Sequence, residues 1–175
     1  FRMPRGYFLA IEPGRIAAIQ VFTRFDDATN CDGTPPCLLT TTTDQSLGLQ
    51  RALALPNSGV PLVSANMSLG GGRYYAYCDA TQTARKAAID NLRSAGVVTV
   101  ISSGNDGYPD SIGVPACISS AVSVGSTTDA DGVSSFSNRA PFLSLMAPGS
   151  DIISSVPGGG YRSLNGTSMA APHVT

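Results

Sequence analysis

Asn165-Gly-Thr-Ser-Met-Ala-Ala-Pro-His-Val-Thr175 is the most informative stretch of the chain, because it presents a serine at the start of a predicted helix. Gly166 permits a tight turn, and Thr167 or Ser168 can cap the helix. A hydroxyl at a helix N-terminus lies among free N–H groups, which favour developing negative charge. Pro172 has no N–H to donate to the Ser168 carbonyl, so we expect an irregular first turn. The stretch predicts a nucleophilic serine, although Asn-Gly-Thr-Ser alone is also typical of an ordinary turn with an N-cap.

The residues before this stretch alternate between short apolar runs, which predict buried strands, and helical patterns. Strand, helix, strand, helix, strand with continuous apolar strands predicts one α/β domain over residues 1–175. We expect a three-layer fold with a mostly parallel sheet and helices on both faces, incomplete at both ends. The expected strands are 16–22, 60–69, 97–101, 121–125, 143–146 and 152–156. We expect a short helix within 47–55 and a second helix at 81–95, and we expect 26–45 to be a loop.

The composition excludes several classes of protein. Of the 175 residues, 42% are apolar and only 13% are charged, which is typical of a globular domain rather than a disordered chain. The net charge of −1 provides no basic surface for nucleic acid or for an anionic membrane. No apolar run approaches the ~18–20 residues of a membrane helix, and the amino end has no signal-peptide core.

The four cysteines, Cys31, Cys37, Cys78 and Cys117, indicate two disulfides in a secreted protein. The alternative is four buried thiols in a cytosolic protein. Three pairings are possible, and we favour Cys31–Cys37 with Cys78–Cys117, because the first closes a short loop containing Gly and Pro. Chain entropy predicts that these two bonds add about 2 and about 4 kcal/mol of stability. None of the four has CxxC spacing, so we predict no metal site.

Beyond Asn-Gly-Thr-Ser itself, residues 165–174 resemble the serine signature of the subtilisin-like proteases, or subtilases, at every position. The resemblance reaches back to about residue 10. Asn66-Met-Ser-Leu-Gly70 is similar to the segment that lines the substrate cleft in that family, and Ile101-Ser-Ser-Gly-Asn-Asp-Gly107 is similar to the segment with the oxyanion asparagine. Phe136-Ser-Asn138 and Met146-Ala-Pro-Gly149 resemble framework segments.

The resemblance implies a role for each matched position. Ser168 would be the nucleophile, and Asn105 would donate its amide to the oxyanion alongside the Ser168 N–H. Ser68, Leu69 and Gly70 would pair with an extended polypeptide substrate and form one wall of the S1 pocket, with Gly104 on the opposite wall. The residues agree with this, since Asn105 follows a β-branched run at the carboxyl end of a predicted parallel strand, where open α/β sheets bind ligands. Asp106 suggests tolerance of a basic P1 residue, and Ala116 a slightly narrowed pocket.

The only histidine, His173, is not a plausible base for Ser168, because five residues along a helix places it about 140° from the serine. The family's aspartate segment and its His-Gly-Thr-His segment have no match. We therefore expect a carboxyl-terminal portion of a catalytic domain that is inactive alone and comes from a serine endopeptidase. The alternative is a non-catalytic peptide-binding relative. A nucleotide-binding domain is disfavoured, because no phosphate-binding glycine motif follows the first strand.

The remaining expectations concern partners and location. We expect a secreted protein, monomeric in its full-length form, that acts on extended polypeptides and binds neither nucleic acid nor membrane. The chemistry needs no cofactor, and although many subtilases bind structural calcium, the sequence has no dense carboxylate loop that identifies such a site.

Overall fold

The computed structural model describes residues 16–175, which divide into two compact units between Leu62 and Val63. In the first unit, β1 (Thr23–Phe25) pairs antiparallel with β2 (Cys37–Leu39). The helix α1 (Thr42–Asn57) follows and begins with a capping box. Thr41 Oγ1 accepts a hydrogen bond from Asp44 N at 3.1 Å, and the Asp44 carboxylate accepts one from Thr41 N at 3.3 Å.

Two predictions for this unit are wrong. The strand expected at 16–22 is absent. The strand β1 lies immediately after these residues and pairs with β2. The loop expected at 26–45 contains β2 and the first turn of α1. Hydrophobicity reports neither cause: β1 forms where β2 is available as a pairing partner, and the Thr41–Asp44 capping box begins the helix. The helix expected within 47–55 is confirmed, and it is longer.

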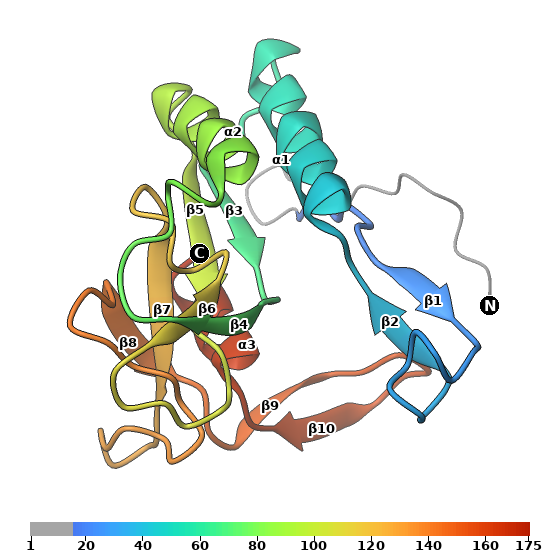
Figure 1. The fold of residues 1–175 in the computed structure, drawn as a ribbon, viewed down its shortest axis with the longest axis vertical. Coiled ribbons are helices and arrows are strands. Elements are labelled where there is room, and N and C mark those ends of the chain that lie inside the picture. Colours follow the sequence, from blue (N-terminus) through green and yellow to red (C-terminus); the bar gives the residue numbers. More distant parts are fainter. Residues whose placement is uncertain (1–15) are drawn as a thin grey trace. The chain divides into compact units, whose positions relative to one another are not determined.

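The second unit is built on a four-stranded parallel sheet, visible in Figure 1, with the strand order β3-β5-β7-β8. Each neighbouring pair of strands is parallel. The helix α2 (Thr83–Ser94) lies in the connection from β3 to β5 and packs against β5. The fold class is therefore α/β with a mostly parallel central sheet, as predicted. The strands are β3 (Ser64–Met67), β5 (Val98–Ser102), β7 (Val122–Thr127) and β8 (Leu145–Pro148).

Most of the strand predictions in this unit are confirmed to within one or two residues. The exception is 60–69, of which only Ser64–Met67 forms a strand. Pro61 has no N–H for a ladder, and Ser68 leaves the sheet to contact the serine segment.

A cluster of small apolar side chains fixes the carboxyl-terminal segment on the sheet. The short helix α3 (Thr167–Ala170) continues directly into the 3-10 turn η1 (Ala171–His173). The buried members of the cluster are Val100 of β5, Val124 of β7, Ala147 of β8, Ala170 and Ala171. Because alanine lets the helix approach the sheet closely, the start of α3 is held at the carboxyl ends of the strands.

Two antiparallel ribbons accompany this sheet. β4 (Gly71–Tyr74) pairs with β6 (Ile112–Val114), and β9 (Ile152–Ser155) pairs with β10 (Tyr161–Leu164). β4, β6 and β10 were not predicted, because they are three or four residues long and β4 and β10 are largely exposed. β9 was predicted at 152–156. A disulfide between Cys78 and Cys117, whose Cα atoms are 5.4 Å apart, joins the residues that follow β4 to those that follow β6.

Both disulfides have the pairing that the sequence favoured. Among residues 16–175, no helix combines the length and apolar character needed to cross a bilayer.

Candidate active site

The turn before Ser168 is anchored to the end of the parallel sheet. Gly149 N donates to Thr127 O at 3.0 Å, and Gly166 N donates to Gly149 O at 2.8 Å. A Cβ atom at Gly149 would lie 2.4 Å from Ser126 Oγ and 2.7 Å from Gly166 O, so no larger residue fits there. This close packing places Ser168, which is half-buried, at the first turn of α3.

Asn105 lies beside Ser168, and Thr167 fixes the orientation of its amide. Thr167 N and Thr167 Oγ1 donate to Asn105 Oδ1 at 2.8 and 2.9 Å. With Oδ1 accepting both hydrogen bonds, the hydrogen-bond network assigns the opposite side of the amide to Nδ2, the donor. Thr167 itself is fully buried. The sequence predicted the role of Asn105 but assigned Thr167 only to capping. The structure makes Thr167 the residue that orients Asn105.

The segment after β3 contacts the serine from the other side. Ser68 Oγ donates to Ser168 O at 2.8 Å, and Ser168 Oγ lies 3.5 Å from Ser68 O. The next residues, Leu69 and Gly70, continue along the cleft towards β4. A Cβ atom at Gly70 would lie 3.0 Å from Val114 O, which makes this wall tight against β6.

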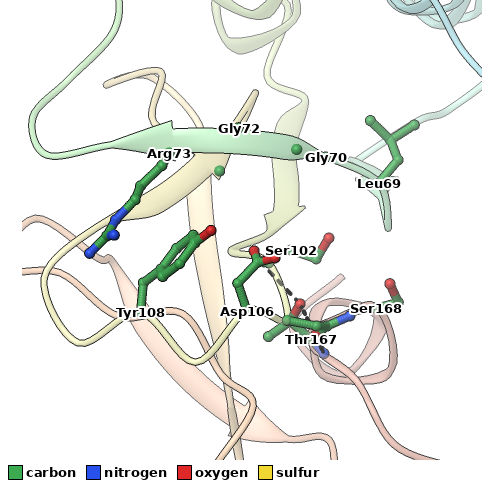
Figure 2. Close-up of a pocket in the computed structure, with 13 residues that line it drawn as sticks. Leu69, Gly70, Gly72, Arg73, Ser102, Asp106, Tyr108, Thr167 and Ser168 are labelled. Atoms are coloured by element: carbon green, nitrogen blue, oxygen red, sulfur yellow. Dashed lines mark hydrogen bonds between the residues drawn. The ribbon is translucent and has the colours of Figure 1, made fainter. Parts of the chain in front are cut away.

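A cavity of about 460 Å³ opens beside Ser168. Figure 2 shows Leu69 and Ser168 at one end and Arg73 and Tyr108 at the other, with Asp106 between them. Five predicted site residues line this one cavity: Ser168, Asn105, Leu69, Gly70 and Gly104. Ala116 is buried and is not among its lining residues. The remaining lining residues are Gly71, Gly72, Arg73, Ser102, Asp106, Tyr108, Gly113 and Thr167.

A buried asparagine, Asn138, supports the wall opposite Gly70. Its Oδ1 accepts from Asp106 N at 2.9 Å and from Tyr108 N at 3.1 Å, and its Nδ2 donates to Asp106 Oδ2 at 3.0 Å. Gly104 has φ +112°, and a Cβ atom there would lie 2.3 Å from Asn138 Nδ2. Gly104 therefore must be glycine for both conformation and space. The sequence singled out Phe136-Ser-Asn138 as framework without assigning it this contact.

Arg73 of β4 spans the far end of the cavity. Its guanidinium carbon lies 4.1 Å from the ring centre of Tyr108 and 5.0 Å from that of Tyr75. Its Nη2 lies 2.9 Å from Asp110 Oδ1, and its Nε donates to Ser111 Oγ at 2.9 Å. The hydrogen bond from Arg73, followed by one from Ser111, lowers the pKa of the Asp110 carboxyl below its ordinary value. No sequence motif indicated this arrangement.

His173 is exposed, and its Nδ1 lies 2.8 Å from Met169 O on the same segment. One ring nitrogen of His173 is thus engaged by the backbone of the same segment, as expected of a hydrogen-bonding residue rather than a base. Over residues 16–175 there is no group of three or more His, Cys, Asp or Glu side chains able to hold a metal ion.

Ser168, Asn105 and the cavity beside them can be set against known families. The family model described as "Subtilase family" matches residues 40–175. The chain belongs to the subtilase family. Among curated relatives, Subtilisin-like protease 1 of Arthroderma gypseum is 43% identical over 121 residues, which are 69% of this chain and 24% of the relative. The same-named protease of Trichophyton rubrum is 40% identical over 121 residues, 69% of this chain and 22% of the relative.

Solved structures of subtilases share the fold. A cold adapted subtilisin-like serine proteinase has 36% identity and a TM-score of 0.62, over 82% of this chain and 47% of that one. The prenylagaramide maturation protease PagA has 30% identity and a TM-score of 0.67, over 81% of this chain and 49% of that one. The chain thus spans about a quarter of the length of the curated relatives it matches.

Proposed function

We propose that this chain supplies the nucleophile and the oxyanion donors of a serine endopeptidase of subtilisin type. The observation that carries the proposal is the arrangement of Ser168 with the oriented amide of Asn105 beside one cavity. A serine, a donor set and an adjoining side-chain pocket are what acyl transfer from a peptide requires.

In this mechanism Ser168 Oγ attacks the peptide carbonyl carbon, and its proton passes to a general base. The carbonyl electrons move to oxygen, and the oxyanion accepts hydrogen bonds from Asn105 Nδ2 and Ser168 N. The tetrahedral intermediate then expels the amine, which takes the proton from the base, and leaves an acyl-enzyme on Ser168. Water hydrolyses this ester by the same steps. The P1 side chain occupies the cavity, and the substrate backbone lies along Ser68, Leu69 and Gly70.

We propose that the general base comes from a part of the parent protein outside these 175 residues. Support comes from the single histidine of the sequence and its hydrogen bond to Met169 O. The chain by itself is then inactive as a triad enzyme, because Ser168 has no group to accept its proton.

A fluorophosphonate probe tests the proposal, since it reacts with activated serines. The full-length parent should hydrolyse peptides and carry the label on the peptide containing Ser168, while the 175-residue chain should do neither. Labelling at a different serine, or turnover that persists in the Ser168→Ala parent, would overturn the assignment.

A second function, peptide binding without cleavage, is favoured by one observation: the single histidine of the sequence is exposed, and its Nδ1 contacts Met169 O. A parent that binds extended peptides, does not cleave them and carries no label would be such a protein.

The remaining proposals follow from the chemistry. The reaction needs no cofactor, since both the nucleophile and the oxyanion donors are protein groups. The partner is an extended polypeptide, and the parent is monomeric, which sedimentation would test. Two disulfides favour an oxidising environment, so we propose that the protein is secreted. Detection of the protein in the culture medium would test that location.

A further inference from the structure

The carbonyl of the nucleophile has no partner from its own helix. In an α-helix the C=O of residue i accepts from the N–H of residue i+4. Four residues after Ser168 stands Pro172, which has no N–H. The preceding donor, Ala171 N, bonds to Thr167 O instead. The nucleophile therefore lies where the helix ladder is interrupted.

Ser68 supplies the missing hydrogen bond from outside the helix. Ser68 Oγ donates to Ser168 O at 2.8 Å. The same Oγ accepts from Asn66 Nδ2 at 3.0 Å, which directs the single hydroxyl proton of Ser68 towards the Ser168 carbonyl. Since Asn66 belongs to β3, a chain of two hydrogen bonds connects the end of β3 to the nucleophile.

Ser68 contacts Ser168 through a second group as well. Its backbone carbonyl lies 3.5 Å from Ser168 Oγ. The carbonyl and the hydroxyl of Ser168 thus both face Ser68. If Ser168 moves relative to Ser68, its attacking oxygen, Oγ, is displaced as well. A misplacement of about 1 Å in such a group costs about 10²-fold in rate.

We propose that Ser68 is a positioning residue for the nucleophile. Its hydroxyl donates to the Ser168 carbonyl the hydrogen bond that Pro172, which has no N–H, cannot donate. This inference rests on the proposed function, and it adds a side-chain role to a residue whose backbone was assigned to substrate pairing.

The activity test compares Ser68→Ala with Ser68→Thr in the full-length parent. The alanine variant should lose about 10- to 100-fold in kcat with little change in KM, because the substrate pairs with the main chain. The threonine variant keeps a hydroxyl and should retain most of the rate. A kcat of Ser68→Ala within twofold of wild type, at an unchanged Tm, would overturn the inference.

A double-mutant cycle with Pro172→Ala separates positioning from general structural support. Alanine at 172 restores an N–H that can donate to the Ser168 carbonyl. The cost of Ser68→Ala in kcat should then be several-fold smaller in the Pro172→Ala background than in wild type. An equal cost in both backgrounds would show that the hydroxyl acts through some other contact, and the proposal would be wrong.

A spectroscopic measurement keeps this inference separable from the proposed function. Ser-Met occurs once in the 175 residues, at Ser168–Met169, so ¹³C-carbonyl serine with ¹⁵N-methionine labels a single peptide group of this chain. In the full-length parent, active or not, Ser68→Ala should move that carbonyl resonance upfield, and Ser68→Thr should leave it in place. An unmoved resonance in Ser68→Ala would refute the hydrogen bond itself, whatever the activity of the parent.

Discussion

The two ends of the cavity are built in different ways (Figure 2). At the Ser168 end, residues of three separate sequence motifs meet across 62 and 100 positions of the chain: Thr167 orients Asn105, and Ser68 contacts Ser168. At the far end, Arg73 reaches Tyr108, Asp110 and Ser111, which are 35 to 38 positions away along the chain. The Ser168 end consists of neutral hydroxyls and amides, whereas the far end holds an ion pair.

This difference indicates a division of roles. Under the proposed function, the Ser168 end would present donors to charge that develops only during the reaction, so changes there should lower kcat. Under the same proposal, the far end would meet only the side chain of a bound substrate, so changes there should alter the choice of substrate and the stability of the cavity by smaller amounts.

Removal of the nucleophile should have the largest effect. Ser168→Ala in the full-length parent should lower kcat by about 10⁶-fold, the magnitude known for nucleophile loss in subtilisin itself. Single-turnover and steady-state assays on a chromogenic peptide would measure it. Ser163→Ala, in the exposed strand β10, is the matched control and should keep wild-type activity. A Ser168→Ala protein that keeps a tenth of the rate would contradict the assignment.

The oxyanion donor should come next. Asn105→Ala should lower kcat by about 10²- to 10³-fold with a small change in KM, again the size known from subtilisin. Asn105→Asp keeps an oxygen to accept from Thr167 N and Oγ1 but has no N–H, so it should lose at least as much.

The matched variant Thr167→Ala leaves the Asn105 amide in place but removes one of its two anchors. It should cost less, about tenfold in kcat. If Thr167→Ala were as damaging as Asn105→Ala, the orientation of the amide rather than its donated hydrogen bond would dominate.

The sequence was most informative where the chemistry lies on contiguous residues. Ser168, Asn105 and Gly104 were assigned roles because the short segments that contain them, 165–174 and 101–107, resemble those of the subtilases. The parallel strands were predictable for a related reason: β5 follows its exposed first residue, Val98, with four consecutive buried residues, and the run 97–101 is a local signal.

The far end of the cavity could not be predicted in this way. Arg73 and Asp110 are separate polar residues whose meaning depends on the pairing of β4 with β6. Those strands are short and β4 is exposed, so neither periodicity nor composition indicates them. Asn138 lies within the family-like segment Phe136-Ser-Asn138, but its contacts with Asp106 and Tyr108 depend on tertiary structure. Strand 16–22 failed for the same reason, since a strand forms where a partner is available.

Charge in the middle of the cavity should affect the choice of substrate. Asp106 lines the cavity, and within residues 16–175 its carboxylate has no ion pair with a basic side chain. The charge of Arg73 is already balanced by Asp110. A basic P1 residue should therefore be favoured, and Asp106→Asn should lower kcat/KM for Lys relative to Leu at P1 by about three- to tenfold, as exposed charges contribute modestly.

The measurement is the ratio of kcat/KM values on paired Lys and Leu substrates at low and at moderate ionic strength. Asp129→Asn, which removes a carboxylate from an exposed turn outside the cavity, is the control and should leave the ratio unchanged. An unchanged ratio in Asp106→Asn would show that the carboxylate serves only its hydrogen bond with Asn138.

The ion pair at the far end should give the smallest effect, and it should depend on pH. The pKa of Asp110 is lowered in the folded protein, chiefly by its hydrogen bond with Arg73. A carboxyl with a lowered folded pKa binds more protons when unfolded, so its contribution to stability is present above the unfolded pKa and is lost as the pH falls through the folded value. At pH 6 the Asp110→Asn variant should therefore melt slightly below wild type, by the order of one degree, because the pair is exposed.

This Tm difference should shrink towards zero as the pH falls below about 4, into the range where the wild-type carboxyl becomes protonated. Arg73→Gln should show the same convergence, because it removes the cation responsible for the lowered pKa. Asp129→Asn, at a carboxyl outside the cavity, should show no such common pattern. A difference between wild type and Asp110→Asn that stays constant from pH 6 to pH 3 would mean that the far end is held by the packing of Arg73 on Tyr108 and Tyr75 rather than by charge. The contrast between a neutral end and a charged end of the cavity would then have no consequence for stability.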